Sequence, residues 1–256
     1  MTVIYTKYGT FIEITRCEKT PNSPKVRVHR SKNRNRPVGP RRPDNIRRTQ
    51  KICVRRVSSA LEEFGCPLLV TLTFKGDSSD ASLANDSLRR FQVRLRDKFP
   101  LAESIFIPEL SPRGRIHFHG LLFNVPLHLG DTRKGRRIIS YGTERETREL
   151  AGLWGHGYVD ATQTDGSPRL AFYISKYITK GAGQVIFNAM RLLRCSRGIP
   201  KEIVIRGALA EKLEEQYAKT KPIKEWEGVR PFVGKVTKKT YQQDGKGILP
   251  ILPKVD

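Results

Sequence analysis

The sequence predicts an α+β fold, and three observations support this prediction. The run Leu68 to Phe74 is apolar and β-branched, which is typical of a buried strand. A second apolar run, Arg115 to Phe123, follows a Pro-Arg-Gly turn signal and predicts a β-hairpin. Two further ranges, Ser82 to Lys98 and Pro168 to Lys180, carry apolar residues at helical spacing. Hydrophobic residues make up 38% of the 256-residue chain, which is enough for a core.

Residues 1–43 are predicted to be a basic, partly mobile N-terminal arm, with one short strand from Gly9 to Ile14. The range Pro24 to Pro43 is rich in Pro, Asn and Arg, so it cannot bury a core. A flexible cationic segment makes sequence-independent, salt-sensitive contacts with phosphate. The predicted nucleic-acid-binding residues are Arg27, Arg30, Arg34, Arg36, Arg41 and Arg42. A solvated linker without a partner is the alternative.

Residues 44–182 are predicted to form the core. A helix begins at Asp44, a favourable N-cap residue, and ends before Gly65. The remaining predicted elements are a strand over Leu68–Phe74, a helix over Ser82–Lys98, strands over Ser104–Leu110 and Arg115–Phe123, a short helix over Thr143–Trp154, a short strand from Gly157 and a helix over Pro168–Lys180. Residues 183–256 are predicted to be a helical or irregular C-terminal extension.

The predicted hairpin fixes the positions of three polar side chains. His117 and His119 are two residues apart on a strand, so both imidazoles project from one face. A three-residue loop, Pro112 to Gly114, pairs Ser111 with Arg115 and therefore Glu109 with His117. The carboxylate then lies on the histidine face. A loop one residue shorter or longer would place it on the opposite face.

The helix over Pro168–Lys180 carries the sequence YISKYITK. Tyr173 and Tyr177 are four residues apart and share one helix face. Lys176 and Lys180 each follow a tyrosine by three residues, which brings an ammonium group beside each ring. Phenols are weak nucleophiles at neutral pH because their pKa is about 10. A cation on the phosphate oxygens and a nearby ammonium group would together permit covalent phosphodiester cleavage by tyrosine.

Three more residues have two readings each. Thr71 and Thr73 share one face of the strand over Leu68–Phe74 and could line the site, although strand propensity alone explains them. His156 could extend the site, but a structural or surface role is favoured.

The composition narrows the class of protein. The net charge of +23 indicates a polyanionic partner, and nucleic acid is the first candidate. The four cysteines form no CxxC pair, which argues against a zinc ribbon and a disulfide framework. The N-terminus has no signal pattern, and no stretch is apolar enough to span a membrane. The chain is therefore expected to be cytoplasmic and without a membrane partner.

The order LVTLTF, then GRIHFHGLLF, then YISKYITK resembles the HUH endonucleases over residues 66 to 182. More narrowly, it is similar to the two-tyrosine rolling-circle replication initiators of small single-stranded DNA phages. The stretch Leu153 to Asp160, LWGHGYVD, is also similar to initiators of microviruses and filamentous phages.

The resemblance implies a ferredoxin-like core with an antiparallel sheet of about five strands and packed helices. It implies Mg²⁺ or Mn²⁺ on His117, His119 and a third polar ligand, for which the hairpin register nominates Glu109; zinc is the second choice. Tyr173 and Tyr177 would be the nucleophiles, and Lys176 and Lys180 would orient or neutralise the phosphate.

The implied reaction is site-specific and strand-specific nicking and joining of DNA through a 5′-phosphotyrosine, with a free 3′-OH and no ATP. The implied partners are the single-stranded DNA of a replication origin, a host helicase and a host DNA polymerase, in a bacterial cytoplasm if a phage encodes the chain. The sequence has no phosphate-binding loop of the helicase type. An HUH relaxase or transposase, and a non-enzymatic binder of single-stranded nucleic acid, remain alternatives.

Overall fold

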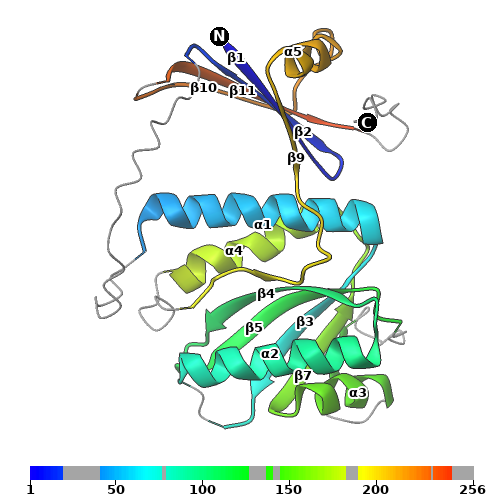
Figure 1. Ribbon diagram of the computed structural model, residues 1–256. Coiled ribbons are helices and arrows are strands. Elements are labelled where there is room, and N and C mark those ends of the chain that lie inside the picture. Colours follow the sequence, from blue (N-terminus) through cyan, green and yellow to red (C-terminus); the bar gives the residue numbers. More distant parts are fainter. Residues whose placement is uncertain are drawn as a thin grey trace. The chain divides into compact units, whose positions relative to one another are not determined.

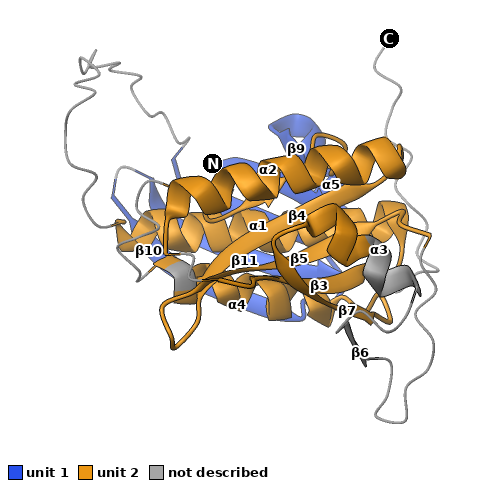
Figure 2. Ribbon diagram, turned by 90° about the horizontal axis from the view of Figure 1, so that it is seen from below, with its two compact units in different colours: residues 1–36, 201–256 blue, residues 37–200 orange. Residues whose placement is uncertain are grey.

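The computed structural model describes residues 1–19, 41–76, 79–126, 137–140, 145–182, 190–231 and 233–243. The chain divides into two compact units, residues 37–200 and residues 1–36 with 201–256 (Figure 2). Both units combine helices with antiparallel sheets, so the predicted α+β class is confirmed. None of the helices in these ranges is long and apolar enough to cross a membrane.

The unit of residues 37–200 contains one sheet and four of the described helices. Its strands are β3 (Leu68–Phe74), β4 (Glu103–Leu110), β5 (Ile116–Phe123), β6 (Arg137–Ser140), β7 (Gly157–Gln163) and β8 (Arg194–Cys195). Its helices are α1 (Pro43–Phe64), α2 (Ala81–Lys98), α3 (Arg145–Trp154) and α4 (Arg169–Ala182). The strand order is β6-β7-β3-β5-β4-β8, and each pair is antiparallel.

The sheet of this unit lies between two helical layers (Figure 1). Helices α2 and α3 lie on one side, and α1 and α4 lie on the other. On the α2 side, Trp154 is fully buried, with its ring centroid 4.9 Å from that of Phe74 and 5.9 Å from that of Phe91. The indole also donates a hydrogen bond to the carbonyl oxygen of Thr73 (3.0 Å). This apolar side holds the sheet rigid, while the other side carries polar residues.

Two helix starts differ from the sequence prediction. Helix α1 begins with Pro43 in its first turn, and its N-cap residue, Arg42, makes no side-chain capping bond. Asp44, predicted as the cap, lies inside the first turn, because the fixed φ of proline suits the first helical position. Helix α2 begins one residue before the predicted Ser82, and the carboxylate of Asp80 accepts hydrogen bonds from the backbone of its first turn.

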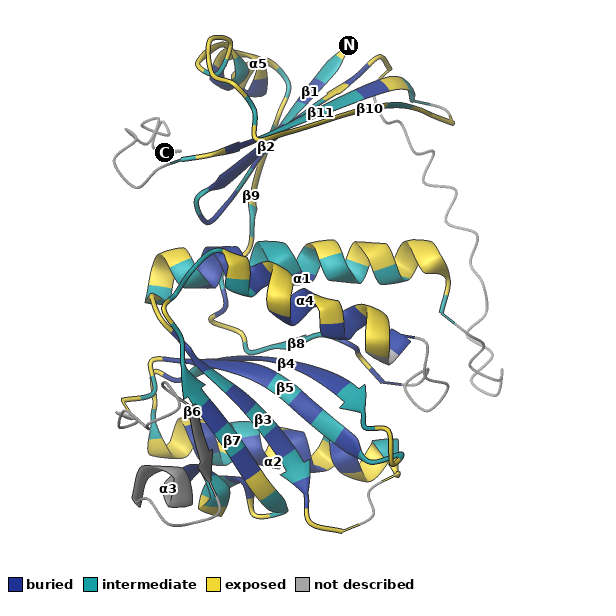
Figure 3. Ribbon diagram, turned by 180° about the vertical axis from the view of Figure 1, so that it is seen from behind, coloured by how far each residue is buried: buried dark blue, intermediate teal, exposed yellow. Residues whose placement is uncertain are grey.

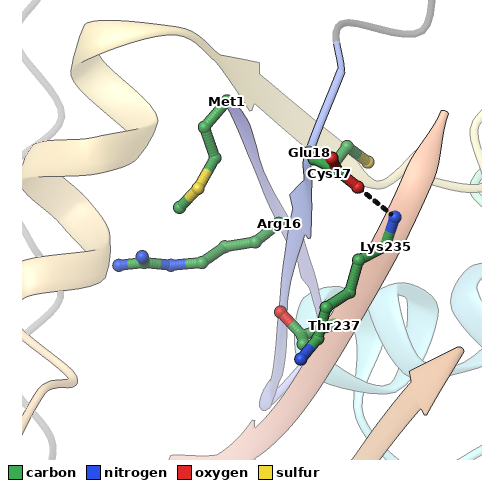
Figure 4. Close-up of a pocket in the computed structure, with 6 residues that line it drawn as sticks. All are labelled: Met1, Arg16, Cys17, Glu18, Lys235 and Thr237. Carbon is green, nitrogen blue, oxygen red and sulfur yellow. Dashed lines mark hydrogen bonds between the residues drawn. The ribbon is translucent and has the colours of Figure 1, made fainter.

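The second unit is built from both ends of the chain. Its strands are β1 (Thr2–Tyr8), β2 (Phe11–Cys17), β9 (Ile203–Arg206), β10 (Lys224–Arg230) and β11 (Gly234–Gln242), in the order β10-β11-β2-β1-β9. Helix α5 (Ala208–Glu215) packs against one face, where Ala210 and Leu213 contact a core that includes Tyr5, Ile12 and Tyr241. At the end of β2, the carboxylate of Glu18 accepts a hydrogen bond from the backbone N–H of Lys235 (2.8 Å; Figure 4).

These strands correct part of the prediction for the chain ends. Helix α5 lies within a range predicted to be helical, but strands β8 to β11 occupy parts of the chain predicted to be helical or irregular. The strand near the N-terminus is a complete hairpin, β1–β2, rather than one short strand. The division into an arm, a core and an extension stays a prediction. The contacts add that strands from residues 1–17 and 203–242 share one sheet.

Most of the predicted basic arm lies outside the described residues. This applies to Arg27, Arg30, Arg34 and Arg36. Arg41 and Arg42 are described, and they precede α1. The guanidinium of Arg41 donates a hydrogen bond to the carbonyl oxygen of Met190, whereas the side chain of Arg42 is exposed. Arg41 therefore has a contact within the protein in addition to its predicted role.

Candidate functional site

The β4–β5 hairpin has the predicted loop and register. The backbone N–H of Ser111 donates to the carbonyl oxygen of Arg115 (2.8 Å), and that of Gly114 donates to Ser111 (2.9 Å). Gly114 has φ +76°, the left-handed conformation that the third loop position requires. Glu109 therefore lies directly opposite His117 in the ladder. The carboxylate and both imidazoles share one face of the sheet.

Two threonines on β3 hold the histidine rings. Strand β3 pairs with β5 so that Thr71 lies opposite His119 and Thr73 opposite His117. The hydroxyl of Thr71 lies 3.2 Å from Nδ1 of His119, and that of Thr73 lies 3.0 Å from Nδ1 of His117. Because each Nδ1 has a hydrogen-bond partner, Nε2 is the ring nitrogen left for chemistry at the surface of the sheet.

Glu109 links the histidine pair to helix α4. One carboxylate oxygen lies 2.5 Å from Nε2 of His119, and the other accepts a hydrogen bond from the ammonium of Lys180 (2.9 Å). Burial alone raises the pKa of Glu109, but Lys180 and His119 outweigh this effect and hold the pKa below its usual value. The side chain is therefore an ionised carboxylate at neutral pH.

Both histidines are neutral at neutral pH, because burial lowers the pKa of His117 and of His119. A neutral imidazole with its Nδ1 fixed by a hydroxyl can donate the lone pair of Nε2 to a cation. Glu109 adds an anionic oxygen on the same face. Imidazole nitrogens and carboxylate oxygens suit divalent cations such as Mn²⁺, and carboxylates suit Mg²⁺.

Helix α4 places both tyrosines at this face. The rings of Tyr177 and His119 are stacked, with centroids 3.9 Å apart and an angle of 14° between planes. The hydroxyls of Tyr173 and Tyr177 lie 3.1 Å apart, within hydrogen-bond distance. Tyr173 is 42% exposed, whereas Tyr177 is only 7% exposed. Burial and the contact with Tyr173 raise the pKa of Tyr177 well above its ordinary value.

The two lysines of the motif take different positions. The ammonium of Lys176 lies 3.8 Å from the ring centroid of Tyr173, close enough for a cation–π interaction. The ammonium of Lys180 lies 5.4 Å from the ring centroid of Tyr177 and also binds Glu109. Lys180 thus connects the helix that carries the tyrosines with the strand that carries the carboxylate.

The structure brings together all seven residues that the sequence suggested for catalysis and metal binding. They are Glu109, His117, His119, Tyr173, Lys176, Tyr177 and Lys180. Among the residues that the structure describes, no group of three or more His, Cys, Asp or Glu is arranged as a metal site. The donor chemistry fits a divalent cation, but one oxygen of Glu109 now contacts His119 directly.

The structure decides between the two readings of the threonines and adds one aromatic residue. Thr71 and Thr73 line the site and contact the imidazoles, which strand propensity alone does not require. Sequence reasoning missed Tyr158 on β7. It lies opposite Thr73, which lies opposite His117, so the three residues form one row across the sheet. Tyr158 is 46% exposed. Figure 3 shows the alternation of buried and more exposed residues along β3 and β7.

His156 lies on the other side of the sheet plane, among aromatic rings. Its ring centroid is 5.1 Å from that of Trp154 and 5.8 Å from that of Phe74. Its backbone carbonyl accepts a hydrogen bond from the N–H of Lys75 (2.8 Å). These contacts support the structural role that the sequence favoured for this histidine.

Comparison with protein-family models gives one finding that covers the site. Residues 67–182 match the model of the replication-associated protein ORF2 family. The matched range begins just before β3 and ends with α4, so it contains the seven residues gathered above. Comparisons with curated proteins and with solved structures gave no match.

Proposed function

Because residues 67–182 belong to the replication-associated protein ORF2 family, which implies DNA binding and a role in phage DNA replication, we propose that the chain is a rolling-circle replication initiator. It nicks one strand of DNA at a replication origin and later joins the ends. It does so through a tyrosine nucleophile, without ATP.

One observation carries this proposal: the two phenol groups lie at the histidine face of the sheet. The ring of Tyr177 stacks on His119, and the hydroxyl of Tyr177 lies 3.1 Å from that of Tyr173. A phosphate near the imidazoles would therefore be within reach of a tyrosine oxygen. Two aromatic residues that served only packing would have no reason to share this polar corner with Glu109 and Lys180.

The proposed first step is a displacement at phosphorus. The tyrosine hydroxyl loses its proton, its oxygen bonds to the scissile phosphorus, and the bond from phosphorus to the 3′ oxygen breaks. The 3′ oxygen takes up a proton and becomes the free 3′-OH, while the 5′ end stays on the tyrosine. Lys176 and Lys180 offset the negative charge that develops on the phosphate.

We assign the first attack to Tyr173. Its ring is 42% exposed, and the ammonium of Lys176 lies over it. Tyr177 is buried, and its pKa is raised, so its phenolate is the more costly of the two to form. Tyr177 acts in the second cleavage, after which the first 3′-OH attacks the phosphotyrosine and closes a circle.

The residues that would hold a divalent cation, Mg²⁺ or Mn²⁺, are His117 and His119 through Nε2 and Glu109 through its carboxylate. When bound, such a cation withdraws negative charge from the non-bridging oxygens of the phosphate. Thr71 and Thr73 keep the imidazoles oriented for this task. Lys180 holds one oxygen of Glu109 and so keeps the carboxylate ionised and on the correct face.

The order of elements supports the finer fold prediction, a ferredoxin-like core. Along the chain the unit runs β3-α2-β4-β5, then α3-β7 after the short strand β6, and the four main strands have the order β7-β3-β5-β4. This is the β-α-β-β-α-β arrangement of ferredoxin-like motifs. As further parts of the proposal, a host helicase and DNA polymerase extend the 3′-OH, and the chain works in a bacterial cytoplasm.

The decisive experiment is a covalent-trapping assay. The protein is incubated with Mn²⁺ and single-stranded circular DNA of the replicating element, and then run on a denaturing gel. A protein-linked 5′ end at one site supports the proposal, and loss of the adduct on chelation supports the cation. A protein that binds DNA but never forms an adduct is the non-enzymatic alternative. Genome context separates replication from relaxase or transposase roles.

A further inference from the structure

The edge hairpin of the second unit carries an exposed tryptophan in an ordered setting. Strands β10 and β11 pair so that Trp226 lies opposite Lys238, and Lys224 and Arg230 lie on the same face as Trp226. Trp226 is 41% exposed. Large exposed aromatic residues on a sheet are uncommon in a merely solvated surface and are enriched where proteins bind partners.

The alternation of side chains along β10 separates the acids from this face. Glu225 and Glu227 point to the opposite face, where Lys239 lies 3.4 Å from Glu225 and Lys235 lies 2.7 Å from Glu227. The face with Trp226 therefore carries cations without an acid on β10. Lys238 on this face pairs at 3.4 Å with Glu13, a buried residue of β2.

The indole of Trp226 is held against the sheet. A Cβ atom built on Gly228 would lie 2.6 Å from Cζ2 and 2.7 Å from Cη2 of the indole, so the six-membered ring occupies the space above this glycine. Arg230 lies on the same side, with its guanidinium carbon 5.6 Å from the ring. The glycine provides a flat seat on which one side of the ring rests.

From this arrangement we propose that Lys224, Trp226, Gly228 and Arg230 form a binding site for single-stranded DNA, separate from the tyrosine site. A base stacks on the indole, and the phosphates on either side of that base meet Lys224 and Arg230. Stacking of bases on aromatic side chains, combined with cations along the backbone, is the general mode of sequence-tolerant single-strand binding. The net charge of +23 favours the same polyanion.

The chain offers a direct optical test, because it has only two tryptophans. Trp154 is fully buried, so Trp226 is the tryptophan that a ligand can reach. The measurement uses the full chain with Tyr173→Phe and Tyr177→Phe, titrated with a short oligothymidine in the presence of a chelator. We expect saturable quenching of tryptophan fluorescence, and we expect it to disappear in the additional variant Trp226→Phe.

Affinity gives the second readout. Trp226→Ala should weaken binding of the oligothymidine between about fivefold and about a hundredfold. Gly228→Ala should also weaken it, because the added methyl group displaces the ring while the tryptophan remains present. Val229→Ala is the matched control: Val229 is exposed on the opposite face of the same strand, and its loss should leave affinity unchanged.

Three results would overturn the proposal. They are unchanged affinity in Trp226→Ala, an equal affinity for duplex DNA of the same length, and tighter binding of oligouridine than of oligothymidine. Circular dichroism of each variant separates a binding defect from unfolding. The outcome is independent of the tyrosine chemistry: if His117→Ala abolishes nicking but keeps the fluorescence change, both sites act as proposed, whereas nicking without any fluorescence change removes only this one.

Discussion

At the scale of single residues, the site depends on pairs of side chains that orient one another. Thr71 and Thr73 fix the imidazoles from one side, and Glu109 contacts His119 from the other. Lys180 then fixes Glu109. The site is therefore already ordered before any substrate binds. Its catalytic power should be sensitive to residues that never touch the phosphate.

The first residue-scale prediction concerns the order of the tyrosines. Tyr173→Phe should abolish the adduct at the first cleavage, because the exposed phenol is the proposed first nucleophile. Tyr177→Phe should keep that adduct but lose joining of the ends, since no second nucleophile remains. Covalent trapping and circle formation measure the two steps separately. An adduct in the double variant would show that neither phenol is the nucleophile.

The second prediction concerns the threonine contacts. Thr73→Val keeps the shape of the side chain but removes the hydroxyl beside Nδ1 of His117, so nicking should fall about 10- to 100-fold. Raising the Mn²⁺ concentration should restore part of the rate. Thr162→Val on β7 is the control, because Thr162 lies on the same face but in a row with Leu69 and Leu121 instead of a histidine. Equal losses in both variants would contradict this role.

At the scale of elements, the hairpin shows why one part of the site could be predicted. Its register depends on the local chemistry of Pro112 to Gly114, and a local rule needs no knowledge of the rest of the fold. The start of α1 was mispredicted for an equally local reason, since Pro43 and Asp44 both favour a first turn. The pairing of Thr73 with His117 could not be predicted, because 44 residues separate them.

One element-scale prediction uses the same substitution at two glycines. A Cβ on Gly120 of β5 would lie 2.9 Å from the carbonyl oxygen of Ile105 and closer still to the ring of Phe106. Gly120→Ala should therefore destabilise the protein by about 1–3 kcal/mol. Gly152 lies exposed in α3 with no atom near its Cβ position, so Gly152→Ala should stabilise by about 0.5–1 kcal/mol. Urea unfolding measures both, and the same sign for both changes would contradict the packing argument.

At the scale of the whole molecule, the sequence predicted the α+β class and the contents of the site but not the second sheet. The core of residues 37–200 joins elements that follow one another closely, and each shows a clear hydrophobic period. Strands β10 and β11 carry many charges, and β2, the partner of β11, lies about 200 residues earlier. Short charged strands reveal themselves only through their partners, which a single sequence does not identify.

The division into two units leads to a prediction for a fragment. Each unit has its own hydrophobic cluster, and the seven site residues all lie in residues 37–200. A fragment of residues 37–200 should unfold cooperatively and form the tyrosine adduct within a few-fold of the full chain. It should bind oligothymidine more weakly, because it lacks Trp226. A fragment that aggregates, or that never forms the adduct, would contradict this division.

The sharing of one sheet by both chain ends has a consequence for synthesis on the ribosome. Residues 2–17 leave the ribosome first, but the strands that flank them, β9 and β11, emerge about 190 and 220 residues later. At about 5–20 residues per second, the early hairpin waits for roughly 10–40 s with both edges unpaired. Any product that stops before residue 203 exposes those edges permanently and invites pairing with a second such product.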